Sequence, residues 1–152
     1  MNIRRASGTV VLGYGNPGRQ DDGLGPALAS AVGALGLPDV TVDEAYQLNI
    51  EDAATLAEHE KVLFVDASKV GAEPYELKKL TAAETISFST HSVGPESVLA
   101  ICEESFNRVP EAWILAIRGY DFALEEGLTP RAEKNLEKAL DFVQPLIRGW
   151  RI

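Results

Sequence analysis

The sequence is poor in the residues that build disulfide frameworks, cysteine metal clusters and membrane spans. It has one cysteine, Cys102, and two histidines among 152 residues, which excludes an internal disulfide and a metal cluster made of cysteines. No apolar run approaches the roughly 18 residues that a membrane-spanning helix needs. The N-terminus lacks a convincing apolar segment followed by a small-residue cleavage site. We therefore expect a cytoplasmic protein without a membrane partner.

Positive charge is also scarce. Asp and Glu number 23 against 14 Lys and Arg, so the net charge is -9. A surface of that sign repels phosphate backbones, and the nearest basic pair, Lys78 and Lys79, is small. We expect a monomer without a nucleic-acid partner. Since excess acid is also a common route to solubility, the charge alone identifies no substrate.

Short apolar runs alternate with longer segments of helical periodicity. Strands are predicted for residues 9–15, 39–45, 61–67 and 112–119, with a short edge strand at 75–80. Helices are predicted for residues 24–35, 50–59, 94–106 and 129–147, the last with Thr129 as its N-cap. This alternation predicts a single three-layer α/β domain over residues 1–152. Its mostly parallel twisted sheet would carry helices on both faces, in a phosphorylase/hydrolase-like arrangement.

Three candidate ligands follow the predicted strands, and parallel sheets form their sites there. Asp22 follows a glycine-rich turn, Asp66 directly follows a buried apolar run, and His91 precedes a predicted helix. A carboxylate after a buried run is costly unless a cation or a donor satisfies it. Two carboxylates and an imidazole could form a three-ligand site with open positions for nickel or zinc. Each also has a structural interpretation: Asp21 or Asp22 could cap the first helix, and a histidine before a helix is commonly a hydrogen-bonded structural residue.

Residues 13–18, Gly-Tyr-Gly-Asn-Pro-Gly, match the pattern of a dinucleotide-binding turn. In such a turn the last glycine opens a helix that faces the pyrophosphate. Here residues 19–23 intervene, and two carboxylates would stand beside the anion. At about 4 Å, like charges repel by on the order of 4 kcal/mol at an effective dielectric constant of 20. The glycines are better explained by a tight turn, and the acids by a nearby cation.

The stretches GYGNPGRQDDGLG, VLFVDAS and STHSVGPESVL together resemble the hydrogenase maturation protease family. These endopeptidases trim the C-terminus of the nickel–iron hydrogenase large subunit. The family's marks are Gly-Asn, four intervening residues, Asp-Asp/Glu-Gly-x-Gly, an Asp that closes the third strand, and a His before a later helix. All of them occur here in order and at matching distances.

The resemblance implies that Asp22, Asp66 and His91 are both the metal-contacting and the catalytic residues, and that Asn16 and the backbone of residues 23–25 shape the loop. It implies no resident cofactor. The nickel belongs to the substrate, where the precursor's own cysteines bind it, and the protease recognises that nickel before cleavage. A surrogate divalent metal is expected to bind in crystals. The implied partner is the hydrogenase large-subunit precursor.

Two alternatives share parts of this pattern. Peptidyl-tRNA hydrolases also begin with Gly-x-Gly-Asn-Pro-Gly, but their next motif, Thr-Arg-His-Asn, carries a catalytic histidine. The corresponding stretch here, at about residues 24–27, is Leu-Gly-Pro-Ala. The second alternative is a non-catalytic, metal-sensing binding module on the same fold, which the presence of all three candidate ligands disfavours.

Overall fold

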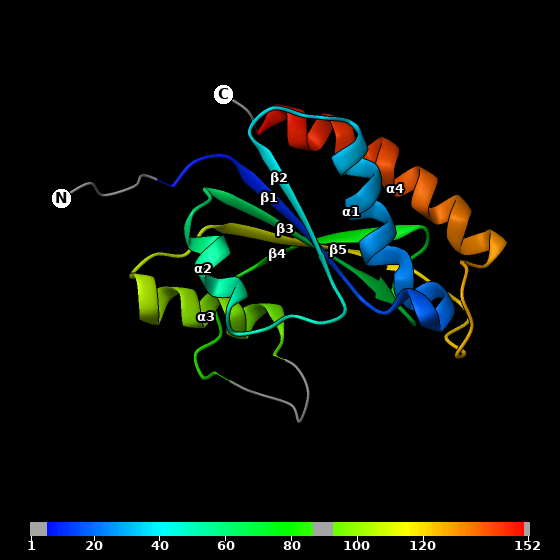
Figure 1. The fold of residues 1–152 in the computed structure, drawn as a ribbon, viewed down its shortest axis with the longest axis horizontal. Coiled ribbons are helices and arrows are strands. Elements are labelled where there is room, and N and C mark those ends of the chain that lie inside the picture. The colour runs from blue at the N-terminus through cyan, green and yellow to red at the C-terminus, as the bar shows by residue number, and fades with distance from the viewer. Residues whose placement is uncertain (1–5, 87–92, 151–152) are drawn as a thin grey trace.

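The computed structural model describes residues 6–86 and 93–150. Strands and helices alternate along the chain (Figure 1). In order they are β1 (Thr9–Tyr14), a 3-10 segment η1 (Pro17–Gly23), α1 (Leu24–Ala34), β2 (Val40–Ala45), α2 (Asp52–Ala57), β3 (Lys61–Ser68), β4 (Tyr75–Leu80), α3 (Pro95–Phe106), β5 (Glu111–Arg118) and α4 (Pro130–Gly149). Each strand and helix predicted from the sequence is therefore present, with shifts of a few residues at the ends.

The five strands form one sheet in the order β2-β1-β3-β5-β4. All neighbouring pairs are parallel except β4 and β5, which are antiparallel. The predicted mostly parallel sheet and the predicted edge position of β4 are both confirmed. The first strand is interior, and the middle strand is β3. Gly13 pairs with Val65, so the end of β1 lies beside the part of β3 that leads into Asp66, and β3 continues to Ser68.

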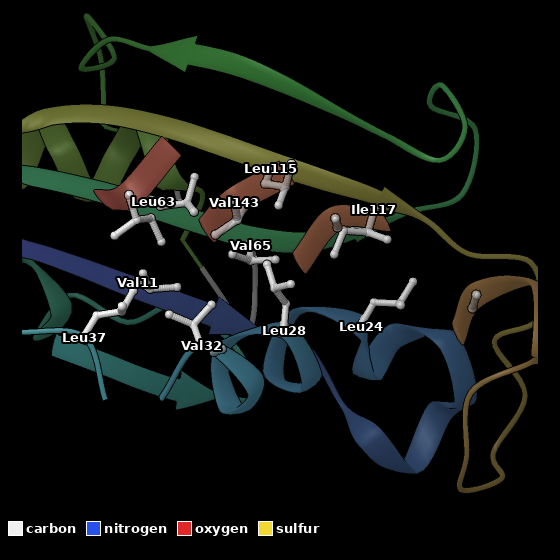
Figure 2. Packing of buried hydrophobic residues seen from close by; sticks show 14 residues of the cluster. Val11, Leu24, Leu28, Val32, Leu37, Leu63, Val65, Leu115, Ile117 and Val143 are labelled. Carbon is white, nitrogen blue, oxygen red and sulfur yellow. The ribbon is translucent and has the colours of Figure 1, made fainter. Parts of the chain in front are cut away.

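Helices cover both faces of the sheet, with α1 and α4 on one side and α2 and α3 on the other (Figure 1). Strand residues alternate between these layers. Val11, Leu63 and Val65 are fully buried on the α1–α4 side, where Figure 2 shows them beside Leu28 and Val143. The opposite core contains Leu12, Phe64 and Leu99, among others. The three-layer α/β prediction is confirmed. No helix in the described part of the chain is long and apolar enough to cross a membrane.

The last helix shows how local sequence sets its start. Thr129 has extended backbone angles, and its side chain accepts a hydrogen bond from the N–H of Ala132. Pro130 occupies the first helical position, where its missing N–H is not needed. The predicted N-cap at Thr129 is confirmed. Thr129 also donates hydrogen bonds to Asp21, in the segment before α1.

Candidate active site

Asp22 and Asp66 lie at the carboxyl ends of β1 and β3, brought together by the close approach of α1 to both strands. The first turn of α1 contains Gly25, whose backbone is pressed against the strand ends. A Cβ at this position would lie 2.4 Å from the carbonyl oxygen of Val65 and 2.5 Å from that of Tyr14. Only glycine permits that approach. Since Asp66 directly follows Val65, it is close enough to Asp22 for the two charges to interact.

The turn before Asp22 holds its carboxylate in place. The backbone N–H of Asn16 donates to Oδ2 of Asp22 at 2.7 Å, while the Asn16 side chain accepts from the N–H of Gly18 at 2.8 Å. Gly15 has a φ of +143°, and a Cβ there would lie 2.0 Å from the carbonyl oxygen of Asp22. The glycines of the motif therefore close a tight turn around a carboxylate, which leaves no place for a pyrophosphate and argues against the dinucleotide interpretation.

Asp66 is partly buried, and its carboxylate has few donors. Burial raises the pKa of Asp66 to about 6, and the neighbouring Asp22 charge also raises it. Two neighbours oppose this shift: the N–H of Ala67 donates to Oδ1 at 2.8 Å, and the adjacent Tyr14 side chain also lowers the pKa. A carboxylate that is short of donors and close to a second carboxylate is a favourable position for a cation.

Asp21, the neighbour of Asp22, has a different role. Its side chain is fully buried and accepts four hydrogen bonds, from the N–H groups of Tyr120, Asp121 and Thr129 and from the Thr129 hydroxyl, at 2.7 to 3.1 Å. Burial by itself would raise its pKa, but these donors hold the pKa of Asp21 below its usual range.

The suggestion that Asp21 or Asp22 caps α1 was therefore wrong. The N-cap is Gly23, without a side-chain bond, because the Asp21 side chain turns toward residues 120–129. These partners lie about 100 residues away in the sequence. No local signal in the sequence links Tyr120 and Asp121 to Asp21.

His91 lies outside the described residues, so its place in the site stays a prediction. Among residues 6–86 and 93–150, no group of three or more His, Cys, Asp and Glu side chains could hold a metal ion. The structure thus brings together the two carboxylates of the expected set. The other histidine, His59, is buried and structural: its ring nitrogens contact the Thr55 carbonyl at 2.8 Å and the Thr41 hydroxyl at 3.2 Å.

Two adjoining hollows flank the Asp22 turn on its β2 side. One, of about 280 Å³, runs from Gly15 to Tyr46, and the other, of about 240 Å³, extends to Leu128; both are lined by Pro17 and Pro26. A larger hollow of about 840 Å³ includes Ser7 and His59, at the opposite end of the strands. We place the candidate site beside the two smaller hollows, because the interacting carboxylates of Asp22 and Asp66 lie at the carboxyl end of the strands.

Comparisons with known proteins agree with this geometry. No protein-family model matches the chain. A protein of Methanocaldococcus jannaschii, itself provisionally described as a hydrogenase maturation protease, is 25% identical over 142 residues, which are 88% of this chain and 92% of the relative. Over most of its length the chain resembles the hydrogenase maturation protease family.

Solved structures of this family share the fold. The hydrogenase maturating endopeptidase HybD of Escherichia coli superposes with a TM-score of 0.76 at 21% identity, over 95% of this chain and 94% of that one. The nickel–iron hydrogenase maturation protease HycI of Thermococcus kodakarensis gives a TM-score of 0.74, also at 21% identity, over 93% of each chain. The expected family and the expected fold are both confirmed.

Proposed function

We propose that this protein is the endopeptidase that removes the C-terminal peptide from the nickel-loaded precursor of a nickel–iron hydrogenase large subunit. The family resemblance supports the reaction class, hydrolysis of a peptide bond during hydrogenase maturation. The observation that carries the proposal is the pair Asp22 and Asp66, held at the carboxyl ends of adjacent parallel strands with their charges interacting. Residues 1–152 would act as one cytoplasmic protease domain.

The two carboxylates are suited to grip a metal that another protein already half coordinates. Asp22 is tethered by the Asn16 N–H and Asp66 by the Ala67 N–H, so each keeps oxygen lone pairs for a further contact. Two negative charges placed together favour a divalent cation. In this proposal both carboxylates contact the precursor's nickel, with His91 as the third ligand. That contact places the scissile peptide. Water attacks its carbonyl carbon, the C–N bond breaks, and the proton that water loses passes to the leaving amine nitrogen.

The experiment that tests this function uses purified protein and a large-subunit precursor, loaded with nickel or left without it. Mass spectrometry follows the loss of the C-terminal peptide. We expect cleavage of the nickel-loaded precursor alone. Asp22→Asn and Asp66→Asn should each lower the cleavage rate by more than about 100-fold. Loss of a group that only supports a metal ligand already costs about 10- to 100-fold, and loss of the ligand itself should cost more.

A matched control is Asp43→Asn, because Asp43 is an exposed carboxylate at the end of the neighbouring parallel strand β2. It should cleave like the unchanged protein. Equal cleavage of the two precursors would contradict recognition through nickel. An unimpaired Asp22→Asn or Asp66→Asn variant would remove that residue from the site, and no cleavage of the loaded precursor would overturn the proposed function.

A further inference from the structure

A basic hollow lies between the segment before β4, the end of β5 and the first turns of α4. Its volume is about 370 Å³, and the residues that matter in its lining are Glu73, Tyr120, Arg131, Lys134, Asn135 and Lys138. Three of these six side chains are positive and one is negative, in a chain whose net charge is -9. Positive charge gathered at one hollow of an acidic protein attracts an anionic ligand to that place.

The hollow adjoins the candidate active site. The backbone N–H of Tyr120 donates to Oδ2 of Asp21 at 2.7 Å, and Asp21 directly precedes Asp22. Tyr75, the first residue of β4, pairs with Ile117 near the end of β5. The hollow therefore lies at the carboxyl end of β5, the end of the sheet that also carries Asp22. A polypeptide that reaches Asp22 has this hollow beside it.

The inner wall of the hollow is held by its own hydrogen bonds. The Tyr120 hydroxyl donates to Oε1 of Glu73, and Nη2 of Arg131 donates to the same oxygen at 2.8 Å. The Arg131 guanidinium lies 4.0 Å from the centre of the Tyr120 ring, and the buried Asn135 donates to the Tyr120 hydroxyl at 2.9 Å. The bond from Tyr120 and the charges of Arg131 and Arg118 hold the pKa of Glu73 below its usual range. Glu73 is therefore ionised and already paired with Arg131.

Lys134 and Lys138 lack such a match. Both are exposed, and in the described part of the chain neither ammonium group forms an ion pair. They are four residues apart on α4, where like charges are neighbours and repel. The acids of this helix, Glu133, Glu137 and Asp141, follow the same spacing in a separate stripe. An anion beside the two lysines relieves their repulsion and breaks no ion pair of the described structure.

We propose that this hollow docks an acidic segment of the hydrogenase large-subunit precursor, whose carboxylates pair with Lys134 and Lys138. This inference rests on the proposed function and deepens it, because it names a contact with the precursor that does not involve nickel. The precursor is the committed occupant because the hollow continues from the site that would cleave it. A contact of this kind is made equally before and during the reaction, so its loss raises KM and leaves kcat unchanged.

The test compares Lys134→Glu/Lys138→Glu with the unchanged protein in steady-state cleavage of the nickel-loaded precursor, followed by mass spectrometry. We expect KM to rise about 10-fold at an ionic strength of about 0.05 M, with kcat unchanged, since each exposed ion pair contributes a few-fold and the reversed charges repel the segment. The difference should shrink at about 0.5 M salt, which screens exposed charges. Biolayer interferometry should show a matching rise in Kd for the nickel-free precursor.

Two control variants separate this hollow from net charge and from general disturbance. Lys78→Glu/Lys79→Glu makes the same change in net charge on β4, toward the opposite end of the sheet, and should leave KM unchanged. Lys134→Arg/Lys138→Arg keeps both charges and should retain the KM of the unchanged protein. Carbodiimide treatment, which joins a lysine amine to a carboxylate with loss of water, should link Lys134 or Lys138 to an Asp or Glu of the precursor.

The inference is overturned if Lys134→Glu/Lys138→Glu leaves KM unchanged, if both charge-reversed variants raise KM equally, or if kcat falls in place of a rise in KM. Sedimentation velocity examines a second copy of the chain as occupant: a dimer that dissociates in Lys134→Glu/Lys138→Glu would also overturn the inference. Failure of the unchanged protein to cleave the loaded precursor overturns the proposed function, whereas cleavage with an unaltered KM in the variant removes this inference alone.

Discussion

Two adjacent aspartates meet opposite environments in this molecule. Asp21 is fully buried yet accepts four hydrogen bonds from residues 120–129, and its pKa lies below the usual range. Asp22 is close enough to Asp66 for their charges to interact, and its described hydrogen bond comes from the backbone N–H of Asn16. Asp66, with fewer donors than Asp21, has a raised pKa. Supply of donors, rather than burial, decides which carboxylate is structural and which remains available for a cation.

The two environments are also mechanically linked. Gln20 and Asp21 donate backbone hydrogen bonds to the carbonyls of Glu125 and Asp121 at 2.8 and 3.0 Å, so the segment before α1 and the segment before α4 pair along their length. The Asp21 side chain adds its four bonds to this pairing. Asp22 therefore extends from a backbone anchored on one side, which fixes its direction at little cost in entropy.

The largest expected effect on stability comes from removing the side chain of Asp21, the structural carboxylate of the pair. Asp21→Ala leaves the N–H groups of Tyr120, Asp121 and Thr129, which donate part-buried hydrogen bonds, without their acceptor. At about 1–3 kcal/mol for each unsatisfied group, partly relieved by water, we expect a loss of roughly 4 kcal/mol in the free energy of unfolding. Thermal denaturation should show a Tm lower by on the order of 10 °C. Asp43→Ala, at an exposed site, is the control, and an unchanged Tm for Asp21→Ala would refute the structural role.

A pH series sharpens the contrast between Asp21 and Asp66. The pKa of Asp66 rises from 3.8 to about 6, so between those values the native protein binds a proton that the unfolded chain does not. The contribution of Asp66 to the free energy of unfolding is fully present below about pH 4 and falls as pH rises toward 6. Asp21 has the opposite sign: its stabilisation is present above pH 4 and is lost as pH falls through its lowered pKa.

Urea denaturation checks these signs. Asp66→Asn should be more stable than the unchanged protein at pH 7, by about 2 kcal/mol, and the difference should shrink toward pH 4. Cleavage should change in the other direction, rising with pH through about 6 in the unchanged protein, because the ionised Asp66 contacts nickel. A stability difference that does not depend on pH would mean that Asp66 is not the group that titrates there.

The smallest expected effect concerns Thr129, which serves both Asp21 and α4. Thr129→Val removes the hydroxyl that donates to Asp21 at 2.8 Å and accepts from the Ala132 N–H at 3.3 Å. We expect a loss of about 1 kcal/mol, typical of a helix N-cap, and a Tm lower by about 2–4 °C. Thr129→Ser keeps the hydroxyl and should retain most of the stability. A loss of cleavage at a temperature where Thr129→Val is folded would contradict a purely structural role.

Much of the fold follows from local patterns in the sequence. The apolar β-branched run at Val10–Leu12 and the run Val62–Val65 are buried on both faces, as parallel strands are. Thr129 starts α4 because its side chain can accept a backbone hydrogen bond one turn ahead. Asp66 is identifiable as a candidate site residue because it ends a buried run, where an unpaired carboxylate would be costly.

Only the tertiary structure distinguished Asp21 from Asp22 and placed Tyr14 beside Asp66. The donors to Asp21 lie 99 to 108 residues away, and the position of Tyr14 depends on the register between β1 and β3. Neither has a periodic or local signal, because strand order and loop docking are set by packing over the whole chain. The sequence by itself determined the elements, the charge and the acids at the strand ends. Tertiary packing decided which of those acids are satisfied by the protein and which are left for a substrate.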